Sequence, residues 1–273
     1  QPPATQRQVG VINSSSILEI CQLSEPAEDH FGSDIRQVSL SVQGGEIVGI
    51  AGVSGNGQAE LFKLLSGEKI HSEPDTIRIN NVGVSRLNSS GRRQLGLACI
   101  PEERLGRGAA AGFNLRDNFF LTHHGRNLLR FGFIKYKEAD RRTADLIDRF
   151  SVICDGPIAA AESLSGGNLQ RFIVGREIGL NPKVLIVSQP TWGLDVAAAA
   201  FIRQALIDLS RAGSAVLVFS EELEELFEIC DHIAVMYAGQ MSPPVARHDT
   251  DIEHIGLLMS GEGFSVQALS RGD

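Results

Sequence analysis

Short apolar runs alternate with helix-like segments in the C-terminal half of the chain. The apolar runs occupy residues 184–187, 215–219 and 233–237. Helical spacing is found at residues 167–179, 197–211 and 222–230. Strands that are apolar on both faces are typical of a parallel sheet covered by helices on both sides. The ligand site of such a sheet lies at the carboxyl ends of its strands.

A glycine-rich turn joins a further strand to a helix nearer the N-terminus, with the strand predicted at residues 46–51 and the helix at 59–66. Turn-bounded strands at residues 17–23, 38–42, 76–79 and 82–84 favour an antiparallel layer. Residues 112–164 carry helical periodicity, clearest at 137–150, without a convincing strand. The predicted fold is α/β, with a parallel core, an antiparallel β layer and a helical subdomain.

The composition argues against several partners. A net charge of -8, with no basic run beyond pairs such as Arg92-Arg93, argues against nucleic acid. No stretch approaches the ~18 apolar residues of a membrane span. We therefore expect a cytoplasmic protein, with residues 1–16 as a linker or cut point, 17–261 as the folded domain and 262–273 as a tail. The four scattered cysteines are expected to be buried and reduced, and the pair His123-His124 to lie on a loop surface.

The glycine-rich turn has the spacing of a phosphate-binding P-loop. Its glycines allow backbone N–H groups to converge on an anion at a helix N-terminus. Gln58 stands where a lysine pairs with phosphates, and Ala59 where a hydroxyl binds Mg²⁺. Taken alone, the loop is equally compatible with a structural turn. The candidate nucleotide-binding residues are Gly52, Ser54, Gly55, Asn56, Gly57, Gln58, Ala59 and Glu60.

A second candidate anion site begins at Leu164. Ser165 supplies a hydroxyl, and Gly166 and Gly167 supply unhindered N–H groups at the positive end of a predicted helix. The alternative is that Ser165 serves only as a helix N-cap.

These segments resemble the motifs of ABC ATPases, in that family's order. The similarity is carried by GVSGNGQAEL, IPEERLGRG, SLSGGNLQR, LIVSQPTWGLDV, FSEELEEL and IGLLMSGE. It is strongest to the C-terminal domain of the double-domain ATPases of sugar and nucleoside uptake, with nucleosides favoured. The resemblance implies a P-loop NTPase fold with a RecA-like core, and ATP as cofactor. It also implies two partners, which are a membrane permease and another ABC domain, expected in the N-terminal half of the same polypeptide. The domain would lie at the cytoplasmic face of the inner (plasma) membrane.

In that family, each ATP is held between the P-loop of one domain and the signature motif of the other. The resemblance assigns the signature motif to Leu164, Ser165, Gly166, Gly167, Asn168 and Gln170. Asp195 matches the acid of the D-loop, and its alternative role is an N-cap. Phe31 matches the aromatic residue that stacks on adenine, and its alternative role is ordinary packing.

The positions that match the family's hydrolytic residues are altered. Ser188 replaces the Mg²⁺-associated Asp and Gln189 the catalytic Glu, so neither position supplies a carboxylate. Glu102 stands at the Q-loop Gln and Glu221 at the switch His, where a negative charge faces phosphates with the wrong sign. We expect no intact catalytic residue and no metal at this site, negligible hydrolysis there, and Mg²⁺ only at the partner's site.

Two alternatives stay open at this point. One is a non-transport ABC protein of translation or DNA repair, although no coiled coil, zinc motif or basic arm is visible. The other is an interaction module whose P-loop holds no nucleotide.

Overall fold

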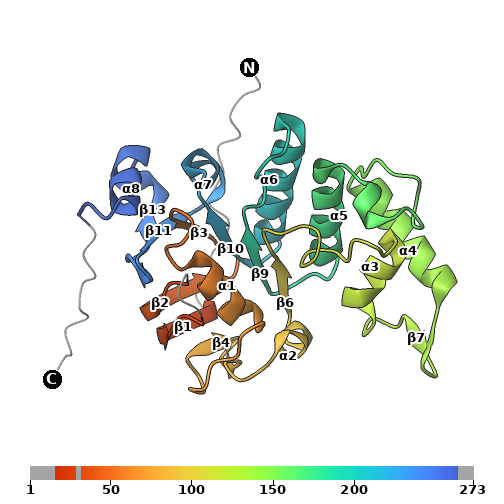
Figure 1. Cartoon of the computed structure of the whole chain (residues 1–273), viewed down its shortest axis with the longest axis horizontal. Helices are drawn as coiled ribbons and strands as arrows, with labels where there is room; N and C mark the ends of the chain where they lie inside the picture. The colour runs from red at the N-terminus through yellow and green to blue at the C-terminus, as the bar shows by residue number, and fades with distance from the viewer. Residues whose placement is uncertain (1–15, 29–31, 264–273) are drawn as a thin grey trace.

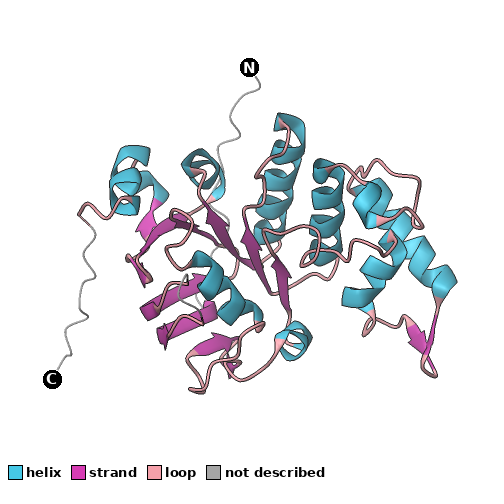
Figure 2. Cartoon of the chain, in the orientation of Figure 1, coloured by secondary structure: helices cyan, strands magenta, loops and turns pink. Residues whose placement is uncertain are grey.

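A computed structural model describes residues 16–28 and 32–263 and shows a mixed sheet between layers of helices (Figure 1, Figure 2). The core sheet has the strand order β12-β11-β3-β10-β9-β6, and β13 pairs with β11. Its strands β3, β6, β9, β10 and β11 run parallel, so the predicted parallel core is confirmed. The strands are β3 (Ile47–Ala51), β6 (Leu97–Ile100), β9 (Val184–Ser188), β10 (Ala215–Ser220), β11 (His232–Tyr237), β12 (Gln240–Met241) and β13 (Val245–Ala246).

The predicted antiparallel layer is also confirmed, with the order β2-β1-β4-β5. Its strands are β1 (Ser16–Glu25), β2 (Ile35–Gln43), β4 (Ile77–Ile79) and β5 (Val82–Gly83). The inward side chains of this layer share one hydrophobic cluster with helix α1 (Gln58–Ser66) and one face of the core sheet. β1 includes Ser16, the first residue that the structure describes, one residue before the strand expected from residue 17.

The helices that come after the helical subdomain in the sequence cover the opposite face of the core sheet (Figure 1). They are α5 (Gly166–Ile178), α6 (Val196–Arg211), α7 (Leu223–Ile229) and α8 (Ile252–Met259). The sequence analysis also missed α2 (Ser89–Gln94), which is short and polar, β6, which has four residues, the two-residue strands β12 and β13, and helix α8. Within the described ranges, no helix combines the length and hydropathy that a membrane crossing requires.

The helical subdomain contains α3 (Leu115–His123), α4 (Tyr136–Arg149) and the 3-10 turn η1 (Ala161–Ser163). The expectation that it lacks strands was wrong, because a hairpin of β7 (Leu129–Arg130) and β8 (Phe133–Ile134) joins α3 to α4. The turn residues Phe131 and Gly132 have φ 51 and 82. A bulky residue with positive φ costs about 1 kcal/mol. Hairpin turns of this kind therefore usually begin with Asn, Asp or Gly, and the sequence Phe131-Gly132 does not show that pattern.

Two expectations about single side chains were wrong. Cys21 is exposed, because it lies on the outer side of β1, whereas Cys230 is buried. Burial raises the pKa of the Cys99 thiol to about 12. His123 is buried, with its ring 3.9 Å from that of Phe119, and only His124 lies on the surface.

The burial of His123 predicts a pH dependence of stability. Burial lowers the pKa of His123 from 6.5 to about 4, so the unfolded chain binds this proton more readily than the folded chain. The free energy of unfolding should fall by roughly 2 kcal/mol between pH 7 and pH 4.5 through this group. Urea unfolding at both pH values should show a smaller decrease in His123→Gln. An equal decrease in both proteins would contradict the assignment.

Candidate nucleotide-binding site

The carboxyl ends of β3, β6, β9 and β10 meet at one pocket of about 60 Å³. Side chains that are far apart in the sequence line it together, and most are those that the motifs singled out. They are Ser54, Gly55, Gln58, Ala59, Phe62, Glu102, Arg107, Ser188, Gln189, Phe219, Ser220 and Glu221. The site therefore lies where a parallel sheet positions its ligand.

The loop between β3 and α1 has the backbone geometry of a phosphate cradle. Gly55 and Gly57 have φ 86 and 107, and Gly57 is the N-cap of α1. The φ of Gly57 requires glycine, because a residue with a side chain would be strained there even if the flexible end of Met236, 2.8 Å from an added Cβ, moved aside. Asn56 anchors the loop, because its Oδ1 accepts a hydrogen bond of 2.9 Å from the N–H of Ala238.

Gln58 gives the cradle a neutral amide. Its side chain folds back over Gly52, where an added Cβ would collide with Gln58 Nε2. Among the described residues, the buried Gln58 Oε1 has no hydrogen-bond partner. A buried carbonyl without a donor costs about 1–3 kcal/mol, and it offers a phosphate no positive charge. The cradle has the backbone geometry for an anion, whereas its side chains do not supply the usual cation.

The residues present do not fit Mg²⁺. Ala59 has no hydroxyl, and Gln189 Oε1 already accepts a bond of 3.3 Å from the N–H of Glu221. Across residues 16–28 and 32–263, no cluster of three or more His, Cys, Asp or Glu side chains is arranged to hold a metal ion. No step at this pocket can therefore be derived through a metal.

Arg107 is the cationic side chain among the described residues that line the pocket. Its Nη2 pairs with Glu68 Oε2 at 2.6 Å, and its guanidinium lies over the Phe62 ring at 5.7 Å. Glu102 and Glu221 line the same pocket. The Arg107 charge is thus already neutralised by a carboxylate.

The second predicted anion site faces outward. Ser165 is the N-cap of α5, and its Oγ accepts bonds from Asn168 N at 3.4 Å and Asn168 Nδ2 at 3.0 Å. Both Ser165 and Gly166 are exposed. The turn therefore caps its helix and also presents the helix N-terminus to the outside, so the two roles considered for Ser165 are compatible.

Three segments are joined around this turn. Arg104 Nε donates to Gln170 Oε1 at 3.2 Å, Gln170 Nε2 donates to Pro190 O at 2.9 Å, and Arg104 also donates to the carbonyl of Trp192. A Cβ on Gly166 would lie 3.2 Å from Arg104 Nη1. Burial lowers the pKa of Arg104. These bonds fix the loops after β6 and β9 relative to the start of α5.

Asp195 caps the next helix. Its Oδ1 accepts a bond of 2.9 Å from Ala198 N at the start of α6, and its Oδ2 lies 3.8 Å from where a Cβ on Gly167 would be. Trp192, three residues earlier, is 55% exposed. Phe31 lies outside the described residues.

Glu225 on α7 is a buried residue that the sequence analysis missed. Thr191 Oγ1 donates to its Oε1 at 2.7 Å, and Ser220 Oγ donates to its Oε2 at 2.8 Å. Burial raises the pKa of Glu225, although the bonds from Thr191 and Ser220 act in the opposite direction. Glu225 joins the loop after β9 to the end of β10, on both sides of the pocket.

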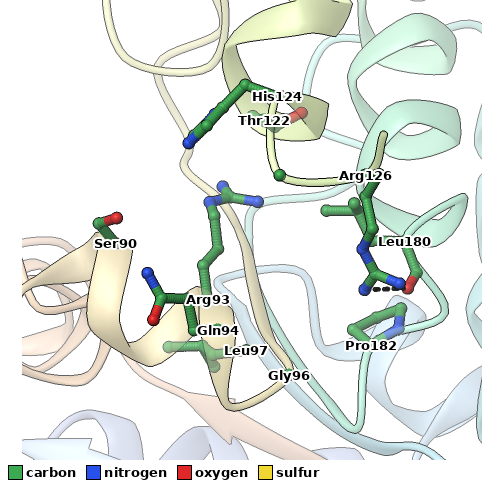
Figure 3. A pocket seen from close by; sticks show the side chains of 11 residues that line it. Ser90, Arg93, Gln94, Gly96, Leu97, Thr122, His124, Arg126, Leu180 and Pro182 are labelled. Carbon is green, nitrogen blue, oxygen red and sulfur yellow. Dashed lines mark hydrogen bonds between the residues drawn. The ribbon is translucent and has the colours of Figure 1, made fainter. Parts of the chain in front are cut away.

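A larger cleft of about 430 Å³ lies between α2, the end of α3 and the segment that precedes β9 (Figure 3). Arg93, His124 and Arg126 line it. Arg93 pairs with the buried Glu177 at 2.6 Å, and Arg126 donates to Leu180 O at 3.2 Å. This basic cleft lies where the core meets the helical subdomain, and it is separate from the pocket at the carboxyl ends of the strands.

A P-loop-like cradle at the edge of a parallel sheet, with a second helix N-terminus exposed, defines a nucleotide-binding cassette. The chain belongs to the ABC transporter family, which it matches over residues 35–192. It is 38% identical over 228 residues to the guanosine import ATP-binding protein NupO of Bacillus subtilis, covering 83% of this chain and 44% of that protein. It is 37% identical over 247 residues to the nucleoside import ATP-binding protein NupA of Lactococcus lactis, covering 90% and 48%. The chain thus spans about half the length of these relatives.

Solved structures agree with the fold. An ATP-binding subunit of an ABC transporter superposes with a TM-score of 0.72 at 19% identity, covering 90% of this chain and all of the other. A dimeric ATP-binding cassette in a post-hydrolysis state with ADP and Pi also gives 0.72, at 18% identity, covering 84% and 98%. The predicted ABC fold is confirmed.

The Glu225 contacts predict a difference between two substitutions. Glu225→Ala leaves Thr191 and Ser220 without their acceptor and should lower the free energy of unfolding by about 1–3 kcal/mol. Glu225→Gln keeps an acceptor and avoids burying a charge. Because the folded pKa of Glu225 is raised, the wild type should lose stability relative to Glu225→Gln as the pH rises above 4.5. Urea titrations at pH 4.5 and pH 8 measure this, and a wild-type advantage that grows with pH would exclude the raised pKa.

Proposed function

We propose that this chain is the energy-coupling ATP-binding domain of an importer for nucleosides or simple sugars, with an inactive site of its own and a signature turn that completes a partner's site. The observation that carries the proposal is the exposed Ser165-Gly166 turn at the N-terminus of α5, together with a cradle that lacks the usual charges. The names of NupO and NupA, which specify guanosine and nucleoside import, favour nucleosides over sugars.

The proposed partners are a second ABC domain and a permease. Since the chain spans about half of its relatives, the second domain is expected in the N-terminal half of the same polypeptide. The loop around Glu102 and the helical subdomain would dock the permease, and the cleft of Figure 3 lies where that subdomain meets the core. With these partners, the domain would lie at the cytoplasmic face of the inner (plasma) membrane.

The signature turn can act on an ATP that the partner holds. The Ser165 hydroxyl, the N–H groups of Gly166 and Gly167, and the positive end of α5 would face the terminal phosphate. The bonds of Arg104 and Gln170 would keep this turn in position relative to the loop that carries Asp195. Mg²⁺ and the base for water would come from the partner, since this chain supplies neither.

The absence of charge predicts that the domain alone is inactive. The cation, the metal ligands and the base are all replaced, and the loss of a base alone costs about 10²–10⁴ in rate. The purified chain should hydrolyse ATP no faster than buffer, as measured by phosphate release. Steady Mg²⁺-dependent turnover that copurifies with the chain would contradict the prediction.

The small pocket and the unpartnered Gln58 Oε1 favour one competing function, an interaction module that binds no nucleotide. Calorimetric titration with ATP distinguishes the two. We expect weak binding whose affinity is unchanged by Mg²⁺, because Ala59 has no hydroxyl and Ser188 and Gln189 supply no carboxylate. No binding at all would favour the interaction module.

A substitution in the signature turn should stop ATP hydrolysis by the full assembly. Ser165→Arg places a long cation where the partner's phosphate would approach, and we expect ATP turnover of the assembly to fall at least about 100-fold. Ser163→Arg is the matched control, since Ser163 is also exposed and lies two residues earlier on η1. Turnover that is unchanged in Ser165→Arg, or equally reduced in both variants, would exclude the shared site.

A further inference from the structure

The hairpin of β7 and β8 carries the most exposed aromatic side chains of the described residues. Phe131 is 88% exposed and Phe133 is 79% exposed. Leu129 and Tyr136, on either side of them, are also exposed. The hairpin projects from the helical subdomain on the side away from the core sheet (Figure 1). A concentration of exposed apolar side chains on a protruding tip marks an interaction surface.

The backbone of the hairpin does not favour this choice of residues. Arg130 pairs with Phe133 across the hairpin, so Phe131 and Gly132 form a two-residue turn in which both φ angles are positive. Asn or Gly suits the first turn position better than Phe does. Phe131 is therefore strained, and its ring packs into no core. Folding alone gives no reason for an aromatic residue there.

The charge around the hairpin is opposite in sign to that of the chain. The whole chain has a net charge of -8, yet residues 118–137 contain no Asp or Glu. The same stretch contains four cationic residues, which are Arg126, Arg130, Lys135 and Lys137. Within the described part of the chain, none of the four forms an ion pair with a carboxylate. The charges of Arg130, Lys135 and Lys137 are thus available to an anionic surface, whereas Arg126 lines the cleft of Figure 3 and donates to Leu180 O.

The acid that follows this stretch is already compensated. Glu138 pairs with Arg141 at 2.8 Å and with Arg142 at 2.6 Å. Hydrogen bonds from Arg141 and Arg142 lower the pKa of Glu138 to about 2. Arg130 itself lies over the Phe131 ring at 5.6 Å, so a cation and an aromatic ring are presented together.

We propose that this hairpin inserts its phenylalanine rings into the headgroup region of a membrane that contains anionic phospholipids. Aromatic rings favour the interface between water and hydrocarbon, and flanking cations interact with lipid phosphates. The tip protrudes from the subdomain and carries cations, which suits a lipid surface better than a helical peptide that needs a groove. The contact goes beyond the proposed function, because the hairpin belongs neither to the signature turn nor to the cleft of Figure 3.

Vesicle flotation of the complete chain tests the contact. We expect binding to phosphatidylcholine vesicles that contain phosphatidylglycerol, and none to phosphatidylcholine alone. Phe131→Ser with Phe133→Ser should weaken binding at least about tenfold. Ile153→Ser with Ile158→Ser is the matched control, since those side chains are 80% and 71% exposed in another loop of the subdomain. This pair should leave binding unchanged.

A fluorescent reporter at the hairpin detects membrane insertion directly, so that the test does not rest only on variants that lose vesicle binding. Trp192 is the only tryptophan of the chain, so Phe131→Trp with Trp192→Phe places a single reporter at the hairpin tip. Its emission should shift to the blue with anionic vesicles and be quenched by brominated lipids. Three results would overturn the proposal. These are no vesicle binding by the wild type, equal loss in both serine pairs, and hairpin-dependent binding only to detergent-solubilised permease.

Discussion

The position of one helix N-terminus governs the rest of the site. Because α5 begins at the surface, its dipole and the hydroxyl of Ser165 point out of the domain rather than into the domain's own pocket. The turn is held by neighbouring loops, through the bonds of Arg104 and Gln170. In the proposed function, the anion that meets this turn is the terminal phosphate of an ATP that a partner domain holds, which is why the account needs a partner.

The domain's own cradle has the backbone geometry of a phosphate-binding loop but lacks the charged side chains. The glycines at positions 55 and 57 are required by their positive φ angles, whatever the loop binds. The charges are a separate requirement, and Gln58, Ser188 and Gln189 do not meet it. Polar contacts that remain in the pocket stabilise its walls. Gln189 holds the backbone of Glu221, and Glu225 joins the loops on both sides. These contacts connect the loops on both sides of the pocket.

Much of the fold and the position of the cradle could be predicted from the sequence. Apolar runs located the parallel strands, and the glycine-rich turn located the cradle, because strand period and positive-φ glycines are local signals. Contacts between distant segments carried no such signal. Glu225 is one of several Glu residues in α7, and only the fold shows that Thr191 and Ser220 converge on it. The hairpin at Phe131 was missed because its turn uses a residue that the rules disfavour.

The most direct test places a thiol on the signature turn. In the full assembly, Ser165→Cys would be treated with an ATP analogue that carries a thiol-reactive group on its terminal phosphate, with the wild type reporting the background from the exposed Cys21. The account predicts that the introduced thiol is labelled, and that labelling disappears when the P-loop of the partner domain is disabled. Labelling that survives the loss of the partner's P-loop, or that never occurs, would contradict the shared site.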